Sequence, residues 1–344
     1  MAIQVTNVGA EHAPAWGRFV AGREDASLYH DYSWRDFYTG VFGKETHYLA
    51  ALREDGEIDG VLPLVRQTSI LFGDYLVSLP FFNYGGSLAN SESTRQALFE
   101  KAASLASDLG VDHLEVRETA DFEGWQTRTD KVAMILDLPE TEDELGKMLG
   151  AKRRSQIRRP MRENPEIHKG GLELLDEFYR VFSRNMRDLG TPVYSKRMFA
   201  EIIERFPGIC ELVTIKVHGK PAAVAFLFHH AGVTEIPWAS TVREFNSISI
   251  NMLLYWEVLC SAINRRSSKF DFGRSTIDSG TFRFKKQWGA EPRQLYWHYW
   301  LPPGAEMPGL NPDSGKYDLM IRVWQKLPLW LANFAGPQIV KHLP

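Results

Sequence analysis

The sequence predicts an α/β protein that contains two related domains. The chain has 344 residues, of which 44% are hydrophobic and 24% charged, an ordinary globular composition but too long for one typical core. Strand-like and helix-like periodicities alternate in both halves. The hairpin glycines Gly56 and Gly219, and the helix–strand junctions near residues 110 and 267, recur about 160 residues apart, which indicates a domain-sized internal repeat.

The first half predicts a helix, strands, a second helix and further strands. Asp55-Gly56 between two apolar runs indicates a hairpin, and Gly110 ends the second helix. We assign residues 1–140 to a first domain, with elements over residues 33–43, 47–65, 76–86, 92–110, 111–118 and 131–139.

The second half repeats this order. Thr141 and Glu144 form a capping box that opens a helix through the basic run "KRRSQIRR", and Pro160 is expected to end or kink that helix before residue 160. We assign residues 141–301 to a second domain, with further elements over residues 172–189, 195–206, 210–230, 235–240, 247–266, 269–274, 281–288 and 294–301.

Residues 302–344 are predicted to be a Pro-rich linker followed by an apolar tail. Pro328 and Pro337 interrupt the tail, so it is not expected to span a bilayer. Three alternatives remain for it, namely packing on the body, lying at a membrane surface and docking a partner protein.

Several function classes receive no support from composition. A net charge of −3 gives no overall bias toward nucleic acid or anionic membranes. Cys210 and Cys260 lie in apolar runs without metal-ligand spacing, and the N-terminus lacks the pattern of a secretion signal. We therefore expect a cytoplasmic protein without a metal site.

One stretch of the second half carries a family resemblance. "NMLLYWEVLCSAI", then "FDFGRS" and "FRFKKQWG", resembles the second domain of FemAB-type transferases, which are built of tandem GNAT acyltransferase domains. "GTFRFKKQWGAEPRQLYWHYWL" and the apolar tail are similar to FemAB-like proteins associated with exosortase/PEP-CTERM exopolysaccharide systems. The resemblance covers most of residues 28–301 and implies an α/β (α+β) fold of two tandem GNAT-like domains with mixed sheets.

The resemblance implies a transferase that moves an aminoacyl or acyl group onto an amine or hydroxyl of a cell-envelope, peptidoglycan or exopolysaccharide precursor. No permanently bound cofactor is implied, and the co-substrate is either aminoacyl-tRNA or acyl-CoA. The chain lacks the Arg/Gln-x-x-Gly-x-Gly/Ala pyrophosphate loop of ordinary GNAT enzymes, so this choice stays open.

The same resemblance bears on partners and location. The partners it implies are a small-molecule, lipid-linked or nucleotide-linked saccharide precursor and charged tRNA. An alternative is a chain that binds such a precursor, or a protein partner, without catalysis. The expected location is the cytoplasm, including the inner face of the membrane. Oligomeric state stays undetermined.

Lys285 is the candidate catalytic residue. Phe284-Lys285 matches the position of a lysine that the family associates with catalysis. Helix geometry over residues 281–288 independently puts Phe284 and Trp288 on one buried face, Lys285 at its edge and Lys286 in water. An ammonium there could stabilise the oxyanion of acyl transfer, and as a cation it would need no lowered pKa. The alternative is that both lysines solvate an amphipathic helix.

Asp271, Arg274, Arg154 and Arg158 are candidate substrate-binding residues. Asp271 and Arg274 flank the end of a strand, where ligands gather in open α/β sheets, although a local ion pair that shapes the turn is an alternative. Arg154 and Arg158 form a stripe at i, i+4 that suits the phosphates of tRNA or of a diphosphate-linked precursor; a solvated helix face is the alternative.

Three further features complete the candidate site. The resemblance implies that Arg187 and Tyr194 face the acceptor. The "NYGGS" loop over residues 83–87 offers backbone N–H groups for an anion, although a simple turn is the favoured interpretation. No general base is evident.

Overall fold

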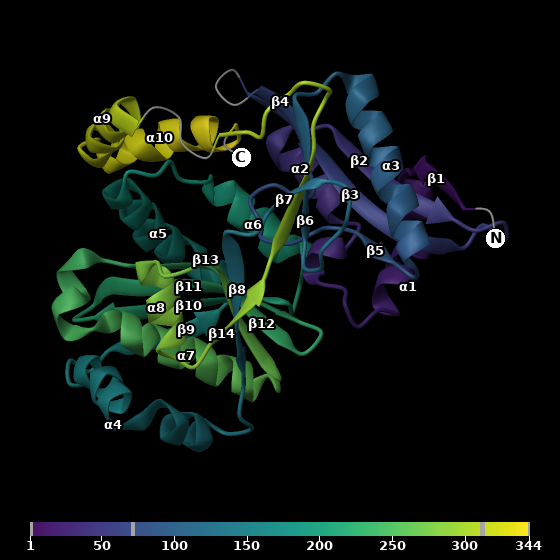
Figure 1. Ribbon diagram of the computed structural model, residues 1–344. Coiled ribbons are helices and arrows are strands. Elements are labelled where there is room, and N and C mark those ends of the chain that lie inside the picture. The colour runs from purple at the N-terminus through teal and green to yellow at the C-terminus, as the bar shows by residue number, and fades with distance from the viewer. Residues whose placement is uncertain (1–2, 70–72, 310–313, 343–344) are drawn as a thin grey trace. The chain divides into compact units, whose positions relative to one another are not determined.

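The computed structural model describes residues 3–69, 73–309 and 314–342 (Figure 1). The chain divides into two compact units, and both combine segments distant in sequence. Unit 1 comprises Met1–Val132, Gln294–Leu310 and His342–Pro344; unit 2 comprises Ala133–Arg293 and Asn311–Lys341.

Unit 1 is built on a mixed sheet in the order β1-β2-β3-β4-β6-β15-β7, with β5 paired to β3. β4 and β6 run parallel, whereas the neighbouring pairs of β3 and β15 are antiparallel. The strands are β1 (Gln4–Asn7), β2 (Thr46–Leu52), β3 (Ile58–Ser69), β4 (Gly73–Val77), β5 (Leu88–Ala89), β6 (His113–Glu118), β7 (Gln126–Arg128) and β15 (Tyr296–Trp300).

Unit 2 is built on a second mixed sheet in the order β14-β8-β13-β12-β11-β10-β9. β12 and β13 run parallel, and β9 to β12 are antiparallel neighbours. The strands are β8 (Lys131–Asp137), β9 (Glu166–Gly170), β10 (Cys210–Val217), β11 (Lys220–His230), β12 (Val233–Thr241), β13 (Lys269–Thr276) and β14 (Glu291–Gln294).

The two sheets have the same strand order, which agrees with the repeat expected from the sequence. β2, β3, β4 and β6 take the places in unit 1 that β10, β11, β12 and β13 take in unit 2. The next strand is exchanged between the halves of the chain: β15 lies beside β6, and β8 lies beside β13. The sequence analysis placed each of these strands in its own half, because periodicity identifies a strand without identifying its partner.

Helices cover both sheets. In unit 2, α5 and α7 lie on opposite faces of the sheet (Figure 1). The helices of unit 1 are α1 (Ala13–Ala21), α2 (Trp34–Phe42) and α3 (Glu92–Leu109), with 3-10 turns at Ala10–His12 and Leu28–His30. Those of unit 2 are α4 (Glu142–Met161), α5 (Leu175–Leu189), α6 (Lys196–Arg205), α7 (Ile250–Asn264), α8 (Gly280–Lys286), α9 (Ser314–Gln325) and α10 (Leu329–Val340), with 3-10 turns at Leu172–Leu174 and Arg243–Ile248.

Helix α4 contains a break at a different position from the expected one. Its capping box forms, with Thr141 and Glu144 bonded to each other's backbone N–H groups. Gly150 interrupts the helix with φ +72° and ψ 171°, and the helix then continues through Pro160 to Met161. Glycine reaches this backbone conformation without a Cβ clash, so the break falls at Gly150, and Pro160 lies inside the helix without ending it.

Candidate functional site

Strands β12 and β13 of unit 2 separate partway along their length. They pair only where Val233–Glu235 lies opposite Lys269–Asp271, although both strands continue well beyond those residues. At the same point the pairing of β12 with β11 shifts register, so that Ile236 and Pro237 stand opposite one β11 residue. A bulge bends its strand and proline donates no ladder hydrogen bond, so β12 turns away from β13 there.

A pocket of about 180 Å³ lies at the end of β12 that follows this bend. Four elements contribute to it: α5, the end of β12, the first turns of α7, and α8. Its lining residues are Asn185, Ala239, Ser240, Thr241, Asn251, Leu254, Tyr255 and Phe284. Ligands of open α/β sheets bind at the carboxyl ends of strands, so this pocket is the candidate binding site of unit 2.

Sequence reasoning missed most of these lining residues. Asn185, Ser240 and Asn251 are ordinary polar residues on three different elements, and only the fold brings them together. The Asn185 amide donates to Ser240 Oγ over 3.1 Å. No spacing in the sequence could have shown this convergence.

Lys285 follows the pocket-lining residue Phe284 on the same short helix. Ser279 caps α8 by accepting the Phe282 N–H. The Lys285 Nζ donates to the carbonyl oxygens of Gly273 (3.0 Å) and Arg274 (2.8 Å), which belong to β13 just beyond its last pair with β12. The ammonium is therefore fixed where the two strands have parted.

The two adjacent lysines are not equivalent, as the sequence predicted. Lys285 is 9% exposed, whereas Lys286 is exposed and its Nζ lies 5.8 Å from the centroid of the Phe282 ring. Burial lowers the pKa of Lys285 to about 8; the Asp271 carboxylate opposes this shift, and Arg274 adds to it. The cation is thus less favoured than in water, which the sequence argument had not required.

The buried face of α8 differs from the expected one. Phe282, Lys285 and Trp288 are buried, whereas Phe284 is only half-buried. The ring of Phe284 lies 4.9 Å from that of Tyr255, and both rings line the pocket. The sequence analysis counted Phe284 as a core anchor because it is aromatic, but the helix turns it toward the pocket.

Asp271 and Arg274 take different positions around Lys285. Asp271 is buried, and its Oδ1 accepts the N–H of Gly273 over 2.7 Å, which holds the bend of β13 where Gly273 has φ +74°. The Arg274 side chain is exposed, while its carbonyl accepts from Lys285.

Arg187 and Tyr194 are not among the pocket-lining residues. Arg187 donates to the Asp188 carboxylate (2.7 Å) and to the carbonyl of Leu327 (3.0 Å), so it holds the C-terminal segment. The carbonyl of Tyr194 accepts the hydroxyl of Tyr179 over 3.0 Å. Both contacts lie within unit 2.

Arg154 and Arg158 differ in their contacts. Arg154 is half-buried and donates to the carbonyl of Gly146 over 2.7 Å, which links the two segments of α4 across the Gly150 break. Arg158 is exposed. The stripe expected from the sequence therefore has one member already engaged by the protein.

In unit 1, the corresponding strands β4 and β6 enclose an arginine. Arg117 is buried, and it donates to Glu115 (2.6 Å) and to the carbonyl of Phe82 (2.6 Å). Its backbone N–H donates to Ser78 Oγ, just past the end of β4. Arg117 therefore ties β6 to the residues that follow β4.

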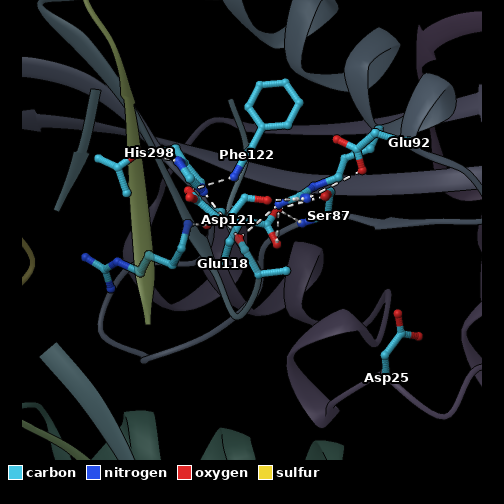
Figure 2. A network of polar contacts seen from close by, with 12 residues as sticks. Asp25, Ser87, Glu92, Glu118, Asp121, Phe122 and His298 are labelled. Atoms are coloured by element: carbon cyan, nitrogen blue, oxygen red, sulfur yellow. Dashed lines mark hydrogen bonds and ion pairs between the residues drawn. The ribbon is translucent and has the colours of Figure 1, made fainter. Parts of the chain in front are cut away.

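A polar network in unit 1 also accounts for the "NYGGS" loop. Glu118 accepts the N–H and the hydroxyl of Ser87, both at 2.7 Å, and lies 3.7 Å from Arg95 (Figure 2). A Cβ on Gly86 would lie 2.6 Å from the Glu118 carboxyl carbon. The anion at this loop is therefore the protein's own carboxylate, whose pKa is raised by burial.

Residues 151–286 match the family model of the acetyltransferase (GNAT) domain. No curated protein matches the chain. Solved structures similar to it include FemX (TM-score 0.64, 14% identity, 86% of this chain and 96% of that chain). A second is the C-terminal domain of a putative lysylphosphatidylglycerol synthetase from Agrobacterium fabrum (TM-score 0.57, 14% identity, 84% of this chain and 92% of that chain). A third is a tandem GNAT protein from the clavulanic acid biosynthesis pathway (TM-score 0.54, 11% identity, 88% of this chain and 98% of that chain).

At these identities the solved structures establish a likeness of fold, a tandem GNAT arrangement with two mixed sheets. The family match includes α7, β13 and Lys285. Among the residues that the structure describes, no cluster of three or more His, Cys, Asp or Glu side chains could hold a metal ion.

Proposed function

We propose that this transferase, whose residues 151–286 are a GNAT-type acyltransferase domain, moves an aminoacyl or acyl group onto an amine or hydroxyl of a cell-envelope or exopolysaccharide precursor. The observation that carries the proposal is the Lys285 ammonium, held by two carbonyls of β13 beyond its last pair with β12, on the helix whose Phe284 lines the pocket. Among the similar structures, the synthetase domain is named for a lysyl product, which supports the aminoacyl form.

The proposed chemistry is attack of the acceptor on the carbonyl carbon of a donor ester or thioester. The carbonyl oxygen becomes an anion in the tetrahedral intermediate, and the bond to the leaving oxygen or sulfur then breaks. The acceptor loses one proton, and the leaving tRNA hydroxyl or CoA thiol takes one up. An ammonium has three N–H donors, and two of those of Lys285 are used by carbonyls. The third would stabilise the oxyanion, and removing such a donor costs about 10²- to 10³-fold in rate.

Phosphate contacts of the donor are proposed for the second segment of α4. Residues 151–162 contain no acidic residue, and Arg158 and Arg159 are exposed. Such a patch attracts the backbone of an aminoacyl-tRNA. It would equally attract the diphosphate of a nucleotide-linked or lipid-linked precursor.

Acyl-CoA is the second candidate donor, and the match to an acetyltransferase domain model favours it. Against it, the loop between β12 and α7 has no glycine-rich pyrophosphate motif, and Ser249 at the start of α7 makes no side-chain cap.

For the acceptor, Arg274 is the proposed phosphate or carboxylate contact. Its exposed guanidinium sits next to the carbonyl that holds Lys285. Arg187, Tyr194 and Asp271 would act by shaping the surroundings rather than by touching substrate. The proposed location is cytoplasmic, and the third candidate function is precursor binding without catalysis.

The donor is tested by supplying acetyl-CoA or alanyl-tRNA with a UDP-linked amino sugar as acceptor. Free thiol identifies the CoA route, and labelled alanine on the sugar identifies the tRNA route. Our preferred outcome is transfer from the tRNA. Tight binding of the nucleotide-linked sugar without turnover from either donor would overturn the transferase proposal in favour of the binding function.

A further inference from the structure

The C-terminal helices α9 and α10 pack against unit 2 by one side only. Arg187 on α5 donates to the carbonyl of Leu327 in the link between the two helices. Gly336 on α10 lies so close to Val193 that a Cβ would come within 2.8 Å of the Val193 nitrogen. The tail is therefore docked on α5 and the segment that follows it.

The other side of these helices exposes large apolar side chains. On α10, Trp330 and Phe334 are 71% and 75% exposed and lie one turn apart. Further exposed members are Leu319 (62%), Met320 (59%), Val323 (55%) and Ile339 (37%), whereas Ile321 lies against Gly190 at the end of α5. We call this set the tail patch. Clustered exposure of this kind marks an interaction surface.

The charged residues within segment 319–342 have one sign, although Asp318 precedes this segment in α9. Residues 319–342 contain Arg322, Lys326 and Lys341 and no Asp or Glu, although the whole chain has a net charge of −3. A second copy of the chain meeting this patch by two-fold symmetry would bring cations against cations, with no acid from the patch between them. An anionic surface is the complementary partner.

The length of the helices decides how they could meet a membrane. α9 and α10 have 12 residues each, or about 18 Å, which is short of the roughly 30 Å hydrocarbon core. In the part of the chain that the structure describes, no helix is long and apolar enough to cross a bilayer. Helices with aromatic residues on one side and cations at its rim lie in the interfacial plane.

We propose that α9 and α10 form a docking surface for an anionic lipid bilayer. Trp330 and Phe334 enter the headgroup–acyl boundary, and Arg322 and Lys326 contact lipid phosphates. The protein side of the tail stays bound to α5.

The test is cosedimentation of the full chain with vesicles of phosphatidylcholine alone or with 30% phosphatidylglycerol. We expect binding to the anionic vesicles, with Trp330→Ser/Phe334→Ser reducing the partition coefficient at least about tenfold, since two aromatic side chains leave the interface. Arg322→Gln/Lys326→Gln should lose the preference for anionic vesicles. Unchanged thermal unfolding would show that each variant is folded.

The control is Met148→Ser/Leu172→Ser, which removes two exposed apolar side chains (50% and 43%, less than Trp330 and Phe334) elsewhere in unit 2. It should bind vesicles like the parent. Absence of vesicle binding by the parent, or equal binding by Trp330→Ser/Phe334→Ser, would overturn the proposal. The proposal would also be overturned if the parent were a dimer that bound no vesicles and Trp330→Ser/Phe334→Ser converted it to monomers. No donor or acceptor is needed, so the result is independent of the transferase proposal.

Discussion

Lys285 is a buried lysine whose two carbonyl contacts fix it against β13. Its pKa is lowered to about 8 by burial, so it is a cation at neutral pH but loses its proton well before an ordinary lysine. As an oxyanion donor it must be protonated, whereas as a general base it must be neutral. The pH dependence of transfer separates these roles.

We expect the single-turnover transfer rate to fall as pH rises through about 8, with a limiting slope of about tenfold per pH unit, as the Lys285 cation is lost. Loss of the Lys285 proton above pH 8 does not destabilise the folded protein. Between this pKa and the ordinary lysine pKa of 10.5 the unfolded chain binds more protons, so Lys285 makes the free energy of unfolding rise with pH. A rate that rises through pH 8 would identify a base instead.

Alanine variants of Phe284 and Phe282 on α8 distinguish a side chain that lines the pocket from one that is buried in the core. Phe284→Ala removes a half-buried ring that lines the pocket, so we expect a higher KM for the substrate held there with a small change in stability. Phe282→Ala removes a buried ring and should cost about 3–5 kcal/mol of unfolding free energy. Steady-state kinetics and urea unfolding measure the two effects. The same stability loss in both variants would contradict the orientation of α8.

At this scale the sequence predicted the difference between Lys285 and Lys286 but not the direction of Phe284. Helical spacing fixes which side chains share a face, and it leaves the rotation of a two-turn helix undecided when three of its residues are aromatic. The carbonyl partners of Lys285 could not be found from spacing either, since they depend on where β13 parts from β12.

Helix α4 separates a structural arginine from an exposed one. Arg154 crosses the Gly150 break to reach the Gly146 carbonyl, whereas Arg158 points to solvent. We expect Arg158→Gln to weaken tRNA binding without changing stability. The slope of the logarithm of the binding constant against the logarithm of salt concentration should fall by the equivalent of about one released counterion. Arg154→Gln should instead lower stability by about 1 kcal/mol.

Fluorescence titration of tRNA at several salt concentrations, with thermal unfolding alongside, measures both effects. Salt-dependent binding that survives Arg158→Gln unchanged would argue against a ligand role for the second segment of α4.

Element positions were largely predictable because periodicity, capping residues and turn glycines are local signals. The capping box at Thr141 and the turn at Gly219 formed as expected. The break of α4 was misplaced because proline is the more familiar helix breaker, while a glycine with positive φ interrupts a helix with less strain. The bulge at Pro237 in β12, which opens the site, has no signal beyond the proline itself.

On the scale of the whole molecule, the exchanged strands β8 and β15 make each sheet depend on both halves of the sequence. β15 lies between β6 and β7, and β8 lies between β14 and β13. Strand partners are a long-range property, so the sequence boundaries at residues 140 and 301 did not anticipate this exchange.

Separate fragments of residues 1–140 and 141–301 are therefore expected not to fold cooperatively alone, since each sheet lacks an inner strand and exposes unpaired backbone groups. Circular dichroism during thermal unfolding measures this, with the full chain as control. A sharp transition in either fragment at the temperature of the full chain would show that the exchange is not required.

The most direct measurement compares the single-turnover transfer rates of Lys285→Met and Lys286→Met. The donor is alanyl-tRNA or acetyl-CoA, whichever the parent protein accepts. Both variants remove one lysine from α8, but only Lys285 is bonded to the β13 carbonyls. We predict a loss of at least about 100-fold for Lys285→Met and none for Lys286→Met. Equal rates in two variants that unfold at the parent's temperature would contradict the assignment of the site.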